Sequence, residues 1–282
     1  MSGPADSGAF VTMVLGTGAF SSKTLLSVAL LRHLSNQGVD AVPYKAMTVL
    51  RDRDLEHSSL LGSGLPYHLL AARVAADPRQ SPVVVRHNGL RRGDLYVHGE
   101  RLGEVAIPCK DAVDLGSLPL GARDHVIDAA HTALDHLTAA HRHVVVEGAG
   151  SAVALPPEDD LPNIGIVRRI RPAIVLVSEF SGGGAAAALI GTSLCLPPDV
   201  RGMIRGYVVA NTGDSAVVRR TTEMVTRASG MRCLGTVPAD DGLGYDELYT
   251  DTAIEGWAAR LKHHVDVEAL LASPDVGVPS AG

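Results

Sequence analysis

The chain has 282 residues, 46% hydrophobic and 20% charged, and this length is enough to bury a full core. The formal net charge of −6 gives no support to nucleic acid as the main partner, because a surface that binds phosphates is basic. The three cysteines, Cys109, Cys195 and Cys233, form no CxxC pair. Their spacing argues against a disulfide framework and against a thiolate metal site.

The first residues and the apolar runs bear on location. Residues 1–10 contain neither the basic nor the apolar stretch of a secretory signal. No apolar run reaches the roughly 18 residues that a membrane span requires. We therefore expect a cytoplasmic protein, with neither a membrane nor a nucleic acid as its partner.

Short runs rich in Val and Ile alternate with helical patterns along the chain. The first strand is predicted at 10–16, and a helix follows at 23–38, where apolar residues recur at helical spacing. A second strand is predicted at 40–47 and a long amphipathic helix at 125–141. Further strands are predicted at 143–150, 172–179, 205–211 and 231–238.

Continuous apolar strands separated by helices predict an α/β fold, with a mostly parallel sheet covered on both faces. Residues 10–271 are predicted to form a single domain, after a loose leader at 1–9 and before a loose tail at 272–282. The alternation and Gly turns of residues 82–107 predict two short antiparallel strands inserted before the long helix. This inserted hairpin could lie at a sheet edge or form part of a substrate lid.

A candidate phosphate loop, GTGAFSSKT at 16–24, lies between the first predicted strand and its helix. A helix that begins with Lys23 and Thr24 suits phosphate binding, because its N–H groups face the anion and the lysine reaches the outer phosphates. The Thr24 hydroxyl can ligate Mg²⁺. The strict pattern GxxxxGK(S/T) is not met, since Thr17 and Ser22 stand where its glycines belong. At a positive φ, serine costs about 1 kcal/mol.

A second motif, VVVEGAGS, places Glu147 at the end of a buried strand, followed by Gly148 and Gly150. An acid at this position can hold Mg²⁺ while the glycines let the backbone approach phosphate or substrate. The alternative is an ordinary strand-end turn with an exposed acid.

Several motifs in order resemble the synthetase domain of cobyric acid synthase and, more distantly, dethiobiotin synthetase. The resemblance covers roughly residues 10–271 and implies the three-layer P-loop NTPase fold. The segments that carry it are GTGAFSSKT, PYKAM, SPVVVRH, GDLYVHGERLGE, VVVEGAGS, DLPNIGIV, VSEFSGGGAAAALIGT, GYVVANTGD and ELYTDTAIEGWAARLKHHVDVEALL. In that family the first glycine of the loop lies one residue earlier than in the common pattern, so Gly16 matches and Ser22 departs.

The sequence departs from the family pattern elsewhere too. Phe20 occupies a loop position where the family usually carries an acid, and Ser181 and Gly182 replace an Asp and an Arg. LLGSG at 60–64 stands where an acidic ligand is expected. The acids left near that segment are Asp52, Asp54 and Glu56. The chain also stops where the family's glutamine-hydrolysing domain would begin.

The resemblance implies ATP and Mg²⁺ as cofactors and assigns roles to individual residues. Catalytic roles fall to Lys23, Lys45 and Glu147, and metal binding to Thr24 and Glu147. The nucleotide would contact Gly16, Thr17, Gly18, Ser22, Lys23, Thr24, Asn211 and Pro238, and the substrate Gly148, Gly150, Ser151 and Glu179. The Asn211 amide can pair with an adenine edge because it both donates and accepts; its alternative reading is a strand-end turn residue.

We therefore predict an ATP-dependent C–N ligase that makes an acyl- or carbamoyl-phosphate on a small acid or amine. One alternative is a dethiobiotin synthetase-like carboxylase that closes a cyclic urea. The other is a nucleotide-binding partner protein that has lost turnover. A separate protein could supply ammonia. The Gly/Ala run at 182–192 predicts either tight packing on its own sheet or, by the habit of the relatives, a homodimer.

Overall fold

The computed structural model of the chain describes residues 8–50, 65–89, 91–109, 112–213, 215–239 and 250–272. Most of the predicted leader and tail lies outside these residues, as do LLGSG at 60–64 and the acids Asp52, Asp54 and Glu56. Within the described residues no helix is long and apolar enough to cross a membrane.

Six parallel strands form the central sheet, in the order β11-β10-β9-β1-β8-β2. They are β1 (Phe10–Gly16), β2 (Ala41–Tyr44), β8 (His143–Glu147), β9 (Ala173–Glu179), β10 (Ile204–Thr212) and β11 (Cys233–Pro238). The predicted α/β class with a mostly parallel sheet is confirmed. Strand β1 lies between β8 and β9, so the loop after it emerges near the middle of the sheet.

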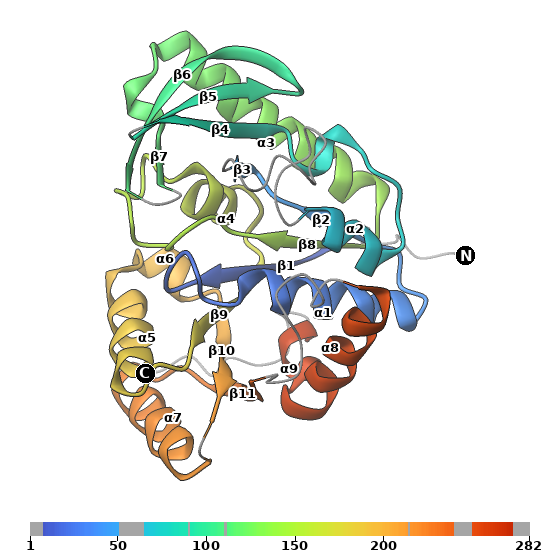
Figure 1. Cartoon of the computed structure of the whole chain (residues 1–282), viewed down its shortest axis with the longest axis vertical. Helices are drawn as coiled ribbons and strands as arrows, with labels where there is room; N and C mark the ends of the chain where they lie inside the picture. Colours follow the sequence, from blue (N-terminus) through green and yellow to red (C-terminus); the bar gives the residue numbers. More distant parts are fainter. Residues whose placement is uncertain are drawn as a thin grey trace, which may run out of the picture.

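Helices cover both faces of this sheet (Figure 1). Met13 and Leu15 of β1 pack into one buried cluster and Val14 into the other, because side chains of a strand alternate between faces. The Val14 face is covered by α1 (Lys23–Asn36), α2 (Leu65–Ala72), α8 (Asp251–His264) and α9 (Val267–Leu271). The opposite face is covered by α3 (Leu120–Ala140), α4 (Ile166–Ile170), α5 (Gly183–Cys195), α6 (Pro198–Arg201) and α7 (Ser215–Ser229). The predicted three layers are therefore present.

A second sheet of five strands lies at one end of the molecule (Figure 1). Its strands are β3 (Met47–Leu50), β4 (Val83–Gly89), β5 (Arg92–Val97), β6 (Glu100–Cys109) and β7 (Ala112–Asp114). Strands β3 and β4 are parallel and the others pair antiparallel. Residues 82–107 thus contribute three strands to a separate sheet, where two short strands were expected. Val85 and Leu95 of this sheet belong to the same buried cluster as Met13, so the two sheets share one core.

The strand predicted at 40–47 divides between the two sheets. Strand β2 ends at Tyr44, and β3 begins at Met47 in the second sheet. Between them, the backbone N–H of Lys45 donates to the carbonyl of Gln80 at 2.8 Å, outside both ladders. The 41–50 run is almost continuously apolar, so its composition gives no sign of the change of sheet. The break places Lys45 at the carboxyl end of β2.

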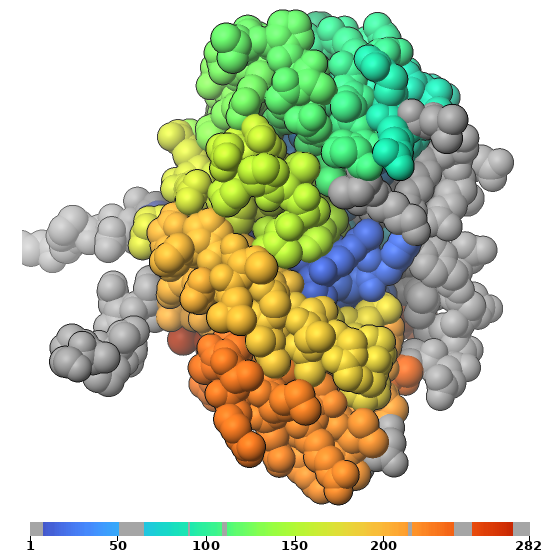
Figure 2. Space-filling model, turned by 90° about the vertical axis from the view of Figure 1, so that its left-hand side faces the viewer, coloured from blue at the N-terminus to red at the C-terminus, as the bar shows by residue number. Residues whose placement is uncertain are grey.

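Three short helical segments complete the described elements: η2 (Pro78–Gln80), η3 (Leu115–Ser117) and the π-helical turn η4 (Leu161–Gly165). Because the six strands are parallel, their carboxyl ends lie at one edge of the central sheet. In Figure 2, the N-terminal part of the chain, in blue, reaches the surface between the lime and yellow parts. Ligands of parallel α/β sheets bind at this carboxyl edge.

Candidate functional site

The loop between β1 and α1 has the arrangement of a phosphate loop. Strand β1 ends at Gly16, where a Cβ atom would lie 2.1 Å from Ser21 Oγ, so the loop can fold back only over a glycine. Ser22 is the N-cap of α1, with φ 62° and ψ 23°. Ser22 therefore has the positive φ at which a serine, unlike a glycine, is strained. The Ser22 hydroxyl also donates to Glu179 Oε1 at 2.8 Å, a contact that the sequence did not indicate.

Lys23 joins the phosphate loop to the segment after β8. Its Nζ donates to the carbonyls of Gly18 at 2.7 Å and Gly150 at 2.8 Å, and the residue is 5% exposed. Thr17 is held from the other side, because its hydroxyl donates to Ser178 Oγ at 3.0 Å and its N–H to the β9 backbone. The loop is thus fixed to both strands that flank β1.

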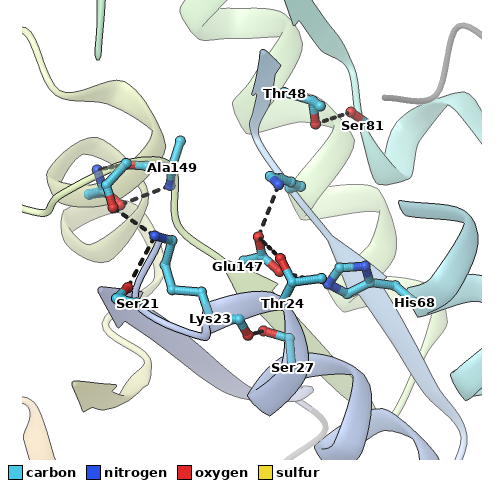
Figure 3. Close-up of polar contacts among 12 residues, drawn as sticks. Ser21, Lys23, Thr24, Ser27, Thr48, His68, Ser81, Glu147 and Ala149 are labelled. Atoms are coloured by element: carbon cyan, nitrogen blue, oxygen red, sulfur yellow. Dashed lines mark hydrogen bonds and ion pairs between the residues drawn. The ribbon is translucent and has the colours of Figure 1, made fainter. Parts of the chain in front are cut away.

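Glu147, at the end of β8, gathers polar groups from three other segments (Figure 3). Its Oε1 accepts from Thr24 Oγ1 at 3.1 Å and from Lys45 Nζ at 2.9 Å, and its Oε2 lies 2.8 Å from His68 Nε2. An ionised carboxylate only accepts hydrogen bonds, so His68 Nε2 carries the proton of this bond. The predicted catalytic and metal-binding residues Thr24, Lys45 and Glu147, which come after β1, after β2 and at the end of β8, therefore lie together at the Glu147 carboxylate.

The charge of Glu147 is set by two opposing effects. The side chain is 3% exposed, and burial alone would raise its pKa. The positive charge of Lys45 and the charge and hydrogen bond of His68 outweigh burial and hold the pKa of Glu147 well below its ordinary value. Glu147 is therefore an anion at neutral pH.

His68 is the site residue that the sequence did not reveal. It lies on α2, where it is buried, and the 65–72 segment LPYHLLAA has an apolar texture with one histidine. A single histidine among apolar residues is usual in a core helix. No pattern in the sequence links it to Glu147, 79 residues away.

The segment after β8 is locked by Asn163. The side chain of Asn163 accepts from Ala149 N at 3.1 Å and donates to Ala149 O at 2.9 Å. A Cβ atom on Gly148 would lie 2.2 Å from Asn163 Oδ1, so this close approach requires glycine. Asn163 also donates to both carboxylate oxygens of Asp160. Ser151 lines a small pocket beside Asp160 and Asn163.

Glu179 and Pro238 are the last residues of β9 and β11, and Asn211 is the next-to-last residue of β10 between them. Asn211 Nδ2 donates to Glu179 Oε1 at 2.9 Å, and Pro238 pairs in register with Thr212. The structure thus brings Asn211 to the phosphate loop through Glu179, because the same oxygen accepts from Ser22. Phe20 projects from the loop and is 58% exposed.

The arrangement suits an anion with a bound Mg²⁺. A hydroxyl and a carboxylate oxygen, Thr24 Oγ1 and Glu147 Oε1, lie 3.1 Å apart at the start of α1. Mg²⁺ in phosphate-binding sites takes one or two protein oxygens and completes its shell with phosphate oxygens and water. Among the described residues, no three His, Cys, Asp or Glu side chains group as a complete metal site. This donor set therefore fits a metal that arrives with a phosphate ligand.

No family model matches the chain, but its sequence is similar to those of several known proteins. It is 32% identical to a probable cobyric acid synthase of Archaeoglobus fulgidus, over 88% of this chain and 52% of that protein. It is also 32% identical to a cobyric acid synthase of Methylibium petroleiphilum, over 88% of this chain and 48% of that protein. Among solved structures, chloroplast FtsY from Physcomitrella patens overlaps 90% of this chain and 66% of its own, with a TM-score of 0.45 and 11% identity. Nothing about function follows from so loose an overlap. The chain spans about half the length of the curated relatives it matches, and over that half it is related to the cobyric acid synthases.

Proposed function

We propose that this chain is an ATP- and Mg²⁺-dependent ligase that forms a C–N bond through an acyl- or carbamoyl-phosphate on a small substrate. The observation that carries the proposal is the meeting of Thr24, Lys45 and His68 on the buried carboxylate of Glu147, beside a lysine-bearing phosphate loop. Sequence relatives named cobyric acid synthase support the same class of reaction. We also propose a cytoplasmic location and a homodimer that pairs through α5.

The nucleotide phosphates would lie over the N–H groups at the start of α1, with Lys23 reaching the outer phosphates. Thr24 and Glu147 would hold Mg²⁺, which neutralises phosphate charge when bound. Glu147 suits this role because it stays ionised at neutral pH. Asn211 would meet the adenine edge and Pro238 the face of the same ring, since both lie at the ends of adjacent strands.

The proposed reaction has two steps. An oxygen of the substrate carboxylate attacks the γ-phosphorus, the bond to the β,γ-bridging oxygen breaks, and ADP leaves. A nitrogen lone pair then attacks the acyl carbon, the C–O bond to phosphate breaks, and the nitrogen releases a proton to solvent. Lys23 and Lys45 would stabilise the charge that develops on the transferred group, while Gly148, Gly150, Ser151 and Glu179 would border the acceptor. Ammonia from solution or from a separate protein is the proposed nitrogen source.

The test is ADP release from Mg·ATP against a panel of small carboxylic acids and diamines, each with and without ammonium and bicarbonate. We expect release over many turnovers only when an acid and ammonium are both present, because an acid alone can form the acyl-phosphate and release ADP once at each site. A bicarbonate requirement would instead mark closure of a cyclic urea. Tight ATP binding with no acceptor-dependent ADP across the panel would contradict the ligase and favour a nucleotide-binding partner protein. Lys45→Ala should abolish release, and Lys262→Ala, on the exposed surface of α8, is the matched control.

A further inference from the structure

One carboxylate oxygen joins the phosphate loop to the end of β10. Glu179 Oε1 accepts from Ser22 Oγ at 2.8 Å and from Asn211 Nδ2 at 2.9 Å. Both donors are non-glycine residues in the left-handed region, with φ 62° at Ser22 and φ 54° at Asn211. Two strained residues from separate segments therefore share a single acceptor.

The strain at Ser22 matters for the loop because Lys23 follows it directly. A residue with a Cβ atom is less stable than a glycine in the left-handed region, and surrounding contacts must hold it there. A hydrogen bond to an ionised acceptor is about twice as strong as a neutral one. The bond from Ser22 to Glu179 is thus strong enough to offset the strain.

Glu179 itself is held in place by its own strand. The N–H of Phe180 donates to the carbonyl of Ala210 at 2.8 Å, and the carbonyl of Val177 accepts from the N–H of Thr17 at 3.1 Å. The carboxylate therefore sits on a backbone that is fixed on both sides. Because a carboxylate only accepts, it also fixes the Asn211 amide with its NH₂ group toward Glu179 and its oxygen facing away.

We propose that Glu179 is a positioning residue, which clamps Ser22 in the left-handed conformation and so replaces the glycine that a phosphate loop normally has there. The role for nucleotide affinity rests on the proposed ATP binding, whereas the clamp itself concerns the fold of the loop. By binding Asn211 as well, Glu179 couples the phosphate loop to the β10 end, where the base would lie.

The test is a double-mutant cycle with calorimetric titration of Mg·ATP. Loss of the clamp in Glu179→Ala or Ser22→Ala should weaken ATP binding about 10-fold or more, the effect of one hydrogen bond to a charged group. Glu179→Gln keeps an oxygen acceptor but loses the charge, so its ATP affinity should lie between those of wild type and Glu179→Ala. Ser22→Gly should bind as tightly as wild type or more tightly, because glycine adopts this φ without strain.

The deciding variant is Ser22→Gly combined with Glu179→Ala. A glycine needs no clamp, so Glu179→Ala should weaken ATP binding much less in the Ser22→Gly background than in wild type, and the loss that remains measures the contact with Asn211. If Glu179→Ala weakens binding equally in both backgrounds, Glu179 acts on the nucleotide directly and the clamp is overturned. Full affinity in the single Glu179→Ala variant would overturn it too.

Failure of the proposed function has a separate signature. If wild type does not bind Mg·ATP, the ligase proposal fails, and the clamp is then judged by urea unfolding of the same proteins. Ser22→Ala and Glu179→Ala should each lower the unfolding midpoint, and together they should lower it no further than the larger single change. Additive losses would overturn the clamp.

Discussion

At the scale of single residues, the environment of Glu147 decides what the site can do. Its carboxylate is buried, yet Lys45 and His68 keep it ionised, so it can attract a metal but cannot act as a general acid near neutral pH. A carboxylate with two separate partners on its two oxygens also has little freedom to turn. Glu147 therefore presents Oε1 to Thr24 at the start of α1.

His68 should be needed for this orientation. His68→Ala leaves Glu147 Oε2 buried without its donor, which should destabilise the fold by about 1–3 kcal/mol and reduce ATP-dependent turnover. His68→Gln can return an N–H to the carboxylate and should recover part of both losses. Urea unfolding and ADP release measure the two effects. Equal behaviour of the Ala and Gln variants would contradict a role in positioning.

Asp160 should give the protein a pH-dependent stability. Burial raises the pKa of Asp160 to about 7, although hydrogen bonds from Asn163 oppose the shift. The folded chain then holds a proton that the unfolded chain releases, so this stability is complete below the ordinary aspartate pKa and is lost as pH rises through about 7.

The unfolding free energy of wild type should therefore fall by about 2–3 kcal/mol between roughly pH 5 and pH 8, relative to Asp160→Asn. The asparagine variant keeps an oxygen acceptor for Asn163 but has no proton to lose. Denaturant titrations of both proteins at the two pH values measure the difference. Parallel pH profiles would contradict it.

The sequence could predict the part of the site that lies at strand ends. Lys45 and Glu147 follow buried strands, and parallel strands place their carboxyl ends at one edge, so their meeting with Thr24 follows from the fold. His68 could not be found, because its only link to the site is a tertiary contact of α2. The hydrogen bond between Ser22 and Glu179 could not be predicted either, since a contact between two distant side chains produces no periodic pattern in the sequence.

At the scale of elements, Arg32 holds three helices together. Its guanidinium, on α1, is buried and donates to the carbonyls of Leu70 at 2.9 Å and Ala71 at 3.1 Å, near the end of α2. It also forms ion pairs of 2.6 Å with Asp251 and Glu255 on α8. Since α1 begins at the phosphate loop and α2 carries His68, Arg32 sets the position of both relative to each other.

Removing Arg32 and removing only its partner Asp251 should lower the free energy of unfolding by unequal amounts. Arg32→Met removes the hydrogen bonds to the Leu70 and Ala71 carbonyls together with both ion pairs, and it should destabilise the protein by about 2–4 kcal/mol, although the Leu70 carbonyl keeps the N–H of Arg73 at 3.3 Å. Asp251→Asn removes an ion pair whose carboxylate is 63% exposed and should cost less than about 1 kcal/mol. Urea unfolding compares the variants. Similar losses would show that the ion pair, rather than the helix-end hydrogen bonds, carries the stabilisation.

The succession of the main strands and helices along the chain was predictable, because buried parallel strands and amphipathic helices have distinct apolar periods. The change of sheet between β2 and β3 was not, since both strands are short and equally apolar. Residues 82–107 showed the alternation of antiparallel strands but no sign that they would pair with β3 and β7 in a five-stranded sheet.

At the scale of the whole molecule, α5 and α7 carry the exposed surface through which we propose that two copies pair. Gly183, Gly184 and Ala187 are exposed on α5, and Leu194 on the same helix is 59% exposed. Met224 on the neighbouring α7 is 57% exposed. Small residues allow close approach of two backbones, and the large side chains supply apolar area to bury.

We therefore expect light scattering to report a dimer at micromolar concentration, and Leu194→Glu or Met224→Glu to dissociate it. Leu120→Glu, at a leucine of α3 that is still more exposed, is the matched control and should leave the dimer intact. A wild-type monomer at that concentration, or the same dissociation by the control, would contradict pairing through this surface.

The measurement that bears most directly on the central claim is calorimetric titration of Mg·ATP into wild type, Lys23→Ala and Lys262→Ala. The phosphate loop at 16–24 is the feature on which the proposed nucleotide, metal and reaction all depend. Loss of the Lys23 ammonium should remove about 1.5–3 kcal/mol of charge-assisted phosphate contact, which is roughly a 10- to 150-fold loss of affinity. Lys262→Ala should bind like wild type, because Lys262 lies on the exposed surface of α8. Equal ATP affinity in wild type and Lys23→Ala would contradict binding across this loop.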